Sequence, residues 1–186
     1  GIVGCASIDD YMNNVIKKHE HTLAKKEDDR IRHVDTCNAN TGPIFLTYRK
    51  NDIISNTVNS WASAHESVYD FVADGVNQTV WVIDDEDIIN TISTEFAKID
   101  ALYIADGHHR CASAVKVGQK RRKKKPDYTG DEEFNFFLSV AFPDDELEIM
   151  DYNRVVKDLN GMSREEFLSS LSHSFEVEKV EAQYKP

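Results

Sequence analysis

The sequence predicts an α/β or α+β domain built around a mixed sheet. Short apolar segments typical of strands alternate with segments whose apolar residues recur at helical spacing, and no repeat period relates them. Of the 186 residues, 40% are hydrophobic and 30% are charged. This length and composition are typical of one folded domain with a substantial core, so we expect residues 1–186 to form a single domain.

The N-terminal quarter predicts two strands and two helices. Residues 2–6 are an apolar strand, and Ser7 is the N-cap of a helix with two aspartates in its first turn. We expect that helix to continue into the charged passage 17–22. A second helix should end near the turn-rich stretch 38–43, and a strand up to Tyr48 follows it.

The middle of the chain predicts a β-hairpin between two helices. Asn51 caps a helix over 52–61, and two strands then flank an Asp-Gly turn. The next helix, capped by Asp84 or Asp85, carries its isoleucines on one face.

The last part of the chain combines strands, a helix and a highly charged stretch. Residues 101–105 are uniformly apolar, as in a central strand, and a helix should run from there through Val117. Basic and acidic runs fill 119–133, which we expect to be a mobile charged loop because like charges cannot pack together. Paired strands over 134–142 and 147–156, a short helix with a capping box and an alternating terminal strand complete the prediction.

The charge balance and the cysteines limit the classes of protein. Asp and Glu outnumber Lys and Arg by 33 to 22, for a net charge of -11, which disfavours a nucleic-acid-binding protein. Cys5, Cys37 and Cys111 form no C-x-x-C pair, so neither a disulfide framework nor a cysteine zinc site is indicated, and a cytoplasmic location is the simplest reading. No apolar run is long enough to span a membrane. The chain opens inside a strand without an initiator Met, so we expect a fragment of a longer protein.

The stretch "LYIADGHHRCASA" places Asp106, Gly107, His108, His109 and Arg110 where a strand is followed by a helix. Free N–H groups in the first turn of that helix, together with the helix dipole, favour a bound anion. Gly107 lets a ligand approach the backbone, while Arg110 and either histidine suit phosphate oxygens. Asp106 would repel a phosphate unless it holds a metal ion or handles a proton, as phosphoryl transfer requires. The alternative is an ordinary Asp N-cap followed by two surface histidines, and no Walker loop is present.

Two further stretches carry polar groups of interest. In "HEHT", Glu20 lies between His19 and His21, a setting that could tune its pKa for general-base catalysis. The two histidines are two residues apart rather than four, so this is not a zincin motif, and a solvated helix end is the alternative. In "NANTGP", Asn40, Thr41 and Gly42 either bind a small polar ligand or merely form a turn, and the turn is favoured.

Four segments in this order, "KKHEHT", "NANTGPIFLTY", "IADGHHR" and "YNRVVKDLNG", resemble the family catalogued as domain of unknown function 1015. The Asp-Gly-His-His-Arg run is also similar to the motif of free serine kinases, which belong with the ParB and sulfiredoxin fold. The resemblance implies a ParB/sulfiredoxin-like core around this loop. It also implies phosphorylation of free L-serine from a nucleotide or from pyrophosphate.

The resemblance also implies roles for individual residues. Gly107, His108, His109 and Arg110 would hold phosphate, with Asp106 assisting catalysis or a Mg ion. Glu20 would deprotonate the serine hydroxyl. Arg154, in "NRVV", would contact a carboxylate or a phosphate.

The leading hypothesis is therefore a cytoplasmic phosphotransferase with Mg and ATP, ADP or pyrophosphate as donor, L-serine as acceptor, and Glu20 or Asp106 as proton acceptor. A non-catalytic nucleotide or phosphate sensor with the same cradle is the second hypothesis. A metal-dependent hydrolase is the third, and its expected ligands are His19, His21, His108, His109 and Asp106.

Overall fold

The computed structural model of the protein describes residues 1–20, 24–150 and 153–179. The chain divides into two compact units, Gly1–Leu147 and Glu148–Pro186, which differs from the single domain that the composition predicts for 1–186. Within the described residues, the first unit contains the sheets, five α-helices and two short 3₁₀ helices, and the second contains α6 (Arg164–Leu171). Among the described residues, no helix combines the length and apolar character needed to cross a bilayer.

The main sheet of the first unit has five strands in the order β1-β7-β3-β6-β2. Their bounds are β1 (Ile2–Ser7), β2 (Ile16–Lys17), β3 (Ile44–Tyr48), β6 (Leu102–Asp106) and β7 (Phe136–Pro143). Strand β7 pairs antiparallel with β1 and parallel with β3, while β6 pairs antiparallel with β3 and parallel with β2. The predicted mixed sheet with helices is thus confirmed.

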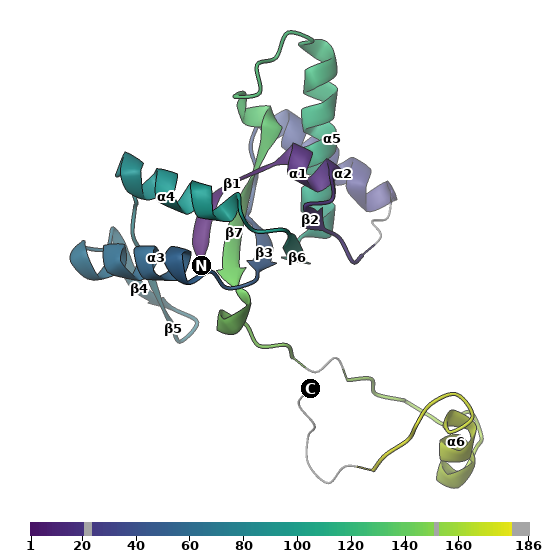
Figure 1. Ribbon diagram of the computed structural model, residues 1–186. Coiled ribbons are helices and arrows are strands. Elements are labelled where there is room, and N and C mark those ends of the chain that lie inside the picture. Colours follow the sequence, from purple (N-terminus) through teal and green to yellow (C-terminus); the bar gives the residue numbers. More distant parts are fainter. Residues whose placement is uncertain (21–23, 151–152, 180–186) are drawn as a thin grey trace. The chain divides into compact units, whose positions relative to one another are not determined.

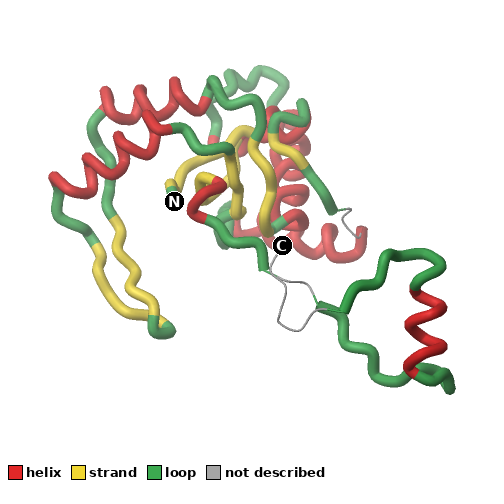
Figure 2. Tube along the Cα trace, turned by 60° about the horizontal axis from the view of Figure 1, so that its bottom comes forward, coloured by secondary structure: helices red, strands yellow, loops and turns green. Residues whose placement is uncertain are grey.

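Helices lie on both sides of this sheet (Figures 1 and 2). The helices of the first unit are α1 (Ile8–Met12), α2 (Ala24–Cys37), α3 (Asp52–Ala64), α4 (Glu86–Phe96) and α5 (His108–Lys124). Helices α2 and α5 pack against each other on one side, and α3 and α4 do so on the other. The core between them is made by apolar side chains from strands and helices, including Ile44, Leu46, Ile104, Val115 and Phe137.

The predicted hairpin is confirmed as a separate two-stranded sheet beside α3 (Figure 1). Its strands are β4 (Tyr69–Ala73) and β5 (Val76–Val80). Asp74 and Gly75 both adopt positive φ, 52° and 77°, as a tight two-residue hairpin turn requires. The indole N–H of Trp61 on α3 donates to the Val82 carbonyl at 2.9 Å and so ties the base of the hairpin to the helix.

The predicted helix caps are also confirmed. The side chains of Ser7, Asn51 and Asp85 each accept a hydrogen bond from a backbone N–H in the first turn of their helices. Ser163 and Glu166 form the reciprocal capping box of α6. Each of these signals is local, so the sequence alone specifies where these helices begin.

The first predicted helix is shorter than expected. Helix α1 ends at Met12, and Asn14 adopts the left-handed conformation with φ 60°. Asn tolerates this region because its short amide can hydrogen-bond locally, and the turn sends the chain back toward the sheet. Ile16 and Lys17 then form the edge strand β2. Residues 17–20 are therefore not part of a helix, and residues 21–22 of the predicted passage lie outside the described residues.

The predicted strands near the C-terminus are wrong over the described residues. Residues 147–150, 153–156 and 174–179 form no strand. Strand β7 already pairs with β1 on one edge and β3 on the other, so an added strand has no free edge of β7 to pair with. Alternating residues without a partner strand cannot form a sheet.

The predicted loop 119–133 is also corrected in its first half, because α5 continues to Lys124. The basic run packs because neighbouring elements supply acidic partners. Lys120 and Arg121 pair with Asp35 of α2, with N–O distances of 2.6 and 3.4 Å. The basic side chains at the end of α5 repel one another, but each ion pair with Asp35 offsets part of that repulsion.

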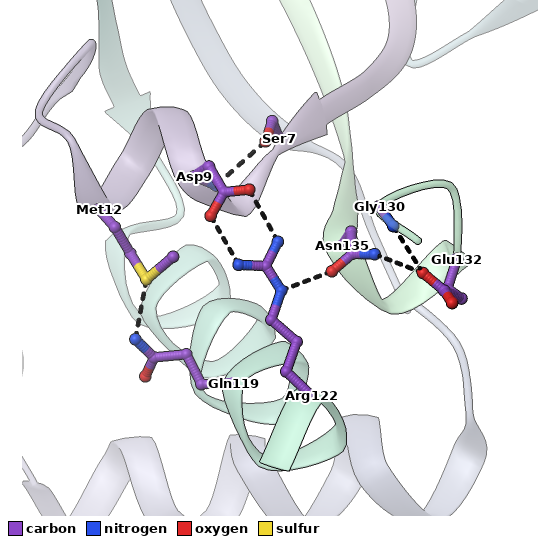
Figure 3. Close-up of polar contacts among 8 residues, drawn as sticks. All are labelled: Ser7, Asp9, Met12, Gln119, Arg122, Gly130, Glu132 and Asn135. Carbon is purple, nitrogen blue, oxygen red and sulfur yellow. Dashed lines mark hydrogen bonds and ion pairs between the residues drawn. The ribbon is translucent and has the colours of Figure 1, made fainter. Parts of the chain in front are cut away.

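Arg122 is the centre of the best-connected polar network in this region (Figure 3). Its guanidinium donates two hydrogen bonds to the Asp9 carboxylate, at 2.6 and 2.8 Å, and a third to the Asn135 side-chain oxygen at 2.6 Å. Asn135 is buried and donates in turn to Glu132 at 3.1 Å. The network joins α1, the end of α5 and the segment that precedes β7.

Glu132 orders the rest of the charged stretch. Its carboxylate accepts from Lys125 at 2.7 Å and from the backbone N–H groups of Thr129 and Gly130, both at 3.0 Å. These hydrogen bonds to the ionised form lower the pKa of Glu132 to about 2.

Candidate functional site

The candidate site begins where β6 passes into α5. Strand β6 ends at Asp106, and Gly107 is the helix N-cap in the left-handed region, with φ 94° and no side-chain cap. The first helical hydrogen bond runs from the Cys111 N–H to the Gly107 carbonyl at 2.9 Å. The backbone N–H groups of His108, His109 and Arg110 therefore have no partner within the helix, at the end where the dipole favours an anion. The predicted strand, turn and helix are confirmed.

The guanidinium of Arg110 lies against two glycines at this helix start. Its Nη2 donates to Asp106 Oδ2 at 2.8 Å. A Cβ placed on Gly107 would lie 3.1 Å from Arg110 Nε, and one on Gly42 would lie 3.2 Å from Nη1. Both glycines therefore leave room for the guanidinium beside the backbone, and the contact of Gly42 has no signal in the sequence.

Glu20 reaches this helix start because of the strand register. Lys17 of β2 pairs with Tyr103 of β6, and the two strands are parallel. Glu20 follows Lys17 by three residues, just as Asp106 follows Tyr103, so both carboxylates come from the same end of adjacent strands. In parallel sheets, ligands bind at this carboxyl end.

The "HEHT" and "ADGHHR" stretches therefore converge. Glu20 Oε2 lies 3.6 Å from His108 Nδ1, and Glu20 Oε1 lies 4.0 Å from His109 Nε2. The ring of His19 meets that of His108 edge-on, with ring centroids 4.4 Å apart. His21 lies outside the described residues.

His108 is the buried member of the group. It is only 5% exposed, and its Nε2 has no hydrogen-bond partner. Burial lowers the pKa of His108, His19 lowers it further, and Glu20 and Asp106 only partly oppose this. The ring is therefore neutral at pH 7. A neutral His108 leaves the half-exposed Glu20 carboxylate without a fully charged partner on this side.

Glu20, His108 and His109 line one cleft of about 980 Å³. The cleft contains the predicted Glu20, Thr41 and all of 106–110, and it adds Asp29 and Arg30 from α2. Sequence reasoning missed this last pair, because charged residues on an exposed helix look the same whether they face a cleft or open water.

One predicted substrate-binding residue of the first unit, Asn40, does not line the cleft. Asn40 lines a separate groove, although it is only one residue from Thr41. Arg154 belongs to the second compact unit, so its proposed contact with a carboxylate or phosphate stays a prediction.

The cleft offers oxygen ligands rather than a closed metal site. Within the part of the chain that the structure describes, no three His, Cys, Asp or Glu side chains are placed to hold a metal ion. Mg²⁺ is usually held by one or two carboxylates and completed by water and substrate phosphates, so a single carboxylate such as Asp106 suits it.

These residues define one class of arrangement, an uncapped helix start with an arginine and two carboxylates beside it, at the carboxyl ends of the parallel strands β2 and β6. The chain belongs to the family described as "Protein of unknown function (DUF1015)", whose model matches residues 1–186. No curated protein matches the chain. No solved structure matches it either.

Proposed function

We propose that the protein is a phosphotransferase that transfers a phosphoryl group from ATP, ADP or pyrophosphate to the hydroxyl of free L-serine. The observation that carries the proposal is the position of Glu20, whose carboxylate lies 3.6 Å from His108 at the uncapped start of α5. A base and an anion site within a few ångströms of each other are what transfer to an alcohol requires.

The phosphate donor would bind at the start of α5. The free N–H groups of the first turn and the Arg110 guanidinium are donors that match phosphate oxygens. Asp106 orients Arg110 through their 2.8 Å hydrogen bond. Asp106 is also the carboxylate that would hold Mg²⁺, which neutralises charge on the phosphates when bound.

Glu20 would accept the proton of the serine hydroxyl. Because His108 is neutral and buried, no strong cation competes for the Glu20 carboxylate from that side. His109, partly exposed beside Glu20, is a donor for a transferring phosphoryl oxygen.

The choice of serine and of a ParB/sulfiredoxin-like core rests on the similarity of the Asp-Gly-His-His-Arg run to that of free serine kinases. The mixed sheet and the position of that run between β6 and α5 are compatible with this core. The experiment below decides which of the three donors, ATP, ADP or pyrophosphate, the protein uses.

The test is to incubate the protein with Mg²⁺, L-serine and each donor separately, and to measure O-phosphoserine by mass spectrometry. We expect product with at least one donor, and Glu20→Gln should lower kcat by about 10²- to 10⁴-fold, as for loss of a general base. Glu66→Gln is the matched control, because Glu66 is an exposed carboxylate between α3 and β4.

Two outcomes would contradict the proposal. Equal turnover in the two variants would exclude Glu20 as the base. Saturable binding of a donor without product would instead favour a nucleotide or phosphate sensor that uses the same cleft.

A further inference from the structure

A second groove, of about 420 Å³, lies farther along the helix whose first turn lines the cleft. On α5 it is lined by Ala114, Val117, Gly118 and Arg121. These positions follow Arg110 by 4, 7, 8 and 11 residues, so they lie on the same face of α5 as Arg110. The groove is therefore a continuation of the helix face that carries the phosphate cradle.

The walls of the groove are apolar and partly aromatic. Val34 of α2 lines the groove, and so do Phe134, Phe136 and Leu138. All four side chains are only partly buried, so they still present apolar surface. A volume of this size and such walls are typical of sites for flat organic ligands.

The polar rim of the groove offers mainly hydrogen-bond acceptors. Arg121 is already held by Asp35 and by the side-chain oxygen of Asn38, so its charge is matched. The side chains of Asn40, Asp131 and Glu133 form no hydrogen bond or ion pair within the described ranges. Free carboxylates and a free amide suit a ligand that carries N–H donors, and they oppose an anionic group in this part of the groove.

The segment Asn38–Gly42 connects the groove with the cleft. Asn38 contacts Arg121 at one end, and Gly42 abuts Arg110 at the other. Between these ends, Asn40 lines the groove and Thr41 lines the cleft. Along α5, Ala114 is only about 6 Å from Arg110, at 1.5 Å per residue.

We propose that this groove binds a planar nitrogen heterocycle of the nucleobase type, with its ring between the apolar walls and its N–H groups on the acceptor rim. Two sources of the base fit this chemistry. One is the base of a nucleotide whose phosphates bind at the start of α5. This first source rests on the proposed function. The other is a separate nucleoside, whose binding would affect the residues of the cleft through the segment Asn38–Gly42.

Cys5 supplies a reporter for the test. It is exposed and lines the groove. Cys111 is buried, and burial raises its pKa to about 12, so it reacts slowly with alkylating reagents. In a Cys37→Ser background, N-ethylmaleimide therefore modifies mainly Cys5. The rate of this modification is measured by mass spectrometry with adenosine, ADP or pyrophosphate present.

We expect adenosine to slow the modification of Cys5 in a saturable manner and pyrophosphate alone not to do so. Asn40→Ala should weaken the protection by adenosine about fivefold, the usual effect of one lost hydrogen bond. Asn59→Ala on α3 is the matched control and should leave it unchanged. Absence of protection by adenosine and ADP, or protection that Asn40→Ala does not weaken, would overturn the proposal.

ADP distinguishes the two sources. If ADP protects Cys5 at lower concentration than adenosine, and Arg110→Ala removes this gain, the base belongs to a nucleotide that spans the groove and the cleft. If ADP is no better than adenosine, and pyrophosphate binds at the same time, the groove takes a separate nucleoside. Neither measurement depends on turnover, so the base site and the phosphotransferase are tested independently.

Discussion

Arg122→Ala should destabilise the first compact unit by about 3 kcal/mol. The Arg122 side chain is 13% exposed and that of Asp9 is 50% exposed. The energy of this ion pair should therefore lie between the values for exposed pairs and for fully buried pairs. Truncating one partner of a fully buried pair costs about 3–5 kcal/mol, whereas exposed pairs contribute about 0.2–1 kcal/mol. In Arg122→Ala, water can solvate the half-exposed Asp9 carboxylate, and this lowers the loss in unfolding free energy. Asn135 is 2% exposed and loses a donor to its side-chain oxygen, which adds about 1–3 kcal/mol.

The measurement is urea unfolding at pH 7, followed by tryptophan fluorescence. Both tryptophans, Trp61 and Trp81, belong to the first unit, so the signal reports on that unit. Lys123→Ala is the matched control, since it removes one exposed cation from the next position of the same helix and should change the unfolding free energy by less than about 0.5 kcal/mol. A loss below about 1 kcal/mol for Arg122→Ala would show that the network of Figure 3 does not hold this end of α5.

Two further predictions concern Glu132 and Gly107. The folded-state pKa of Glu132, about 2, lies below its ordinary value of 4.5, so its stabilisation is complete above pH 4.5 and is lost as the pH falls toward 2. The difference in unfolding free energy between Glu132→Gln and the unmodified protein should therefore vanish near pH 2, and a difference independent of pH would contradict this. Gly107→Ala should cost about 1–2 kcal/mol because of its left-handed backbone, and it should also weaken pyrophosphate binding by displacing Arg110. Gly4→Ala, with no atom near the added Cβ, should do neither, and equal behaviour of the two variants would refute the role of Gly107.

The elements that the sequence predicts well are those with local signals. Ser7, Asn51 and Asp85 are caps that act within one helical turn, and the Asp-Gly pair at 74–75 sets its own turn. The failures depend on contacts between distant segments. Strand β2 is only two residues long and exists because β6 offers it an edge, and α5 extends through a basic run because acidic partners lie on other elements.

The candidate site likewise combines one part that local sequence signals predict and another part that depends on contacts between distant segments. The motif from Asp106 to Arg110 is continuous in sequence, so its strand, turn and helix could be predicted directly. Its approach to Glu20 follows from the register of β2 on β6, which no local pattern encodes. Whether charged residues of α2 such as Arg30 face the cleft is likewise decided by how α2 packs on α5.

The central claim is that the start of α5 binds phosphate through Arg110. The most direct test is to titrate pyrophosphate into the unmodified protein and into Arg110→Ala by calorimetry. Lys123→Ala is the control, because it removes one positive charge from a position farther along the same helix. Hydrogen bonds to charged groups contribute about 1.5–3 kcal/mol, so Arg110→Ala should weaken binding by about 10- to 100-fold. Lys123→Ala should leave the affinity nearly unchanged. Equal affinity of Arg110→Ala and the unmodified protein would contradict the account.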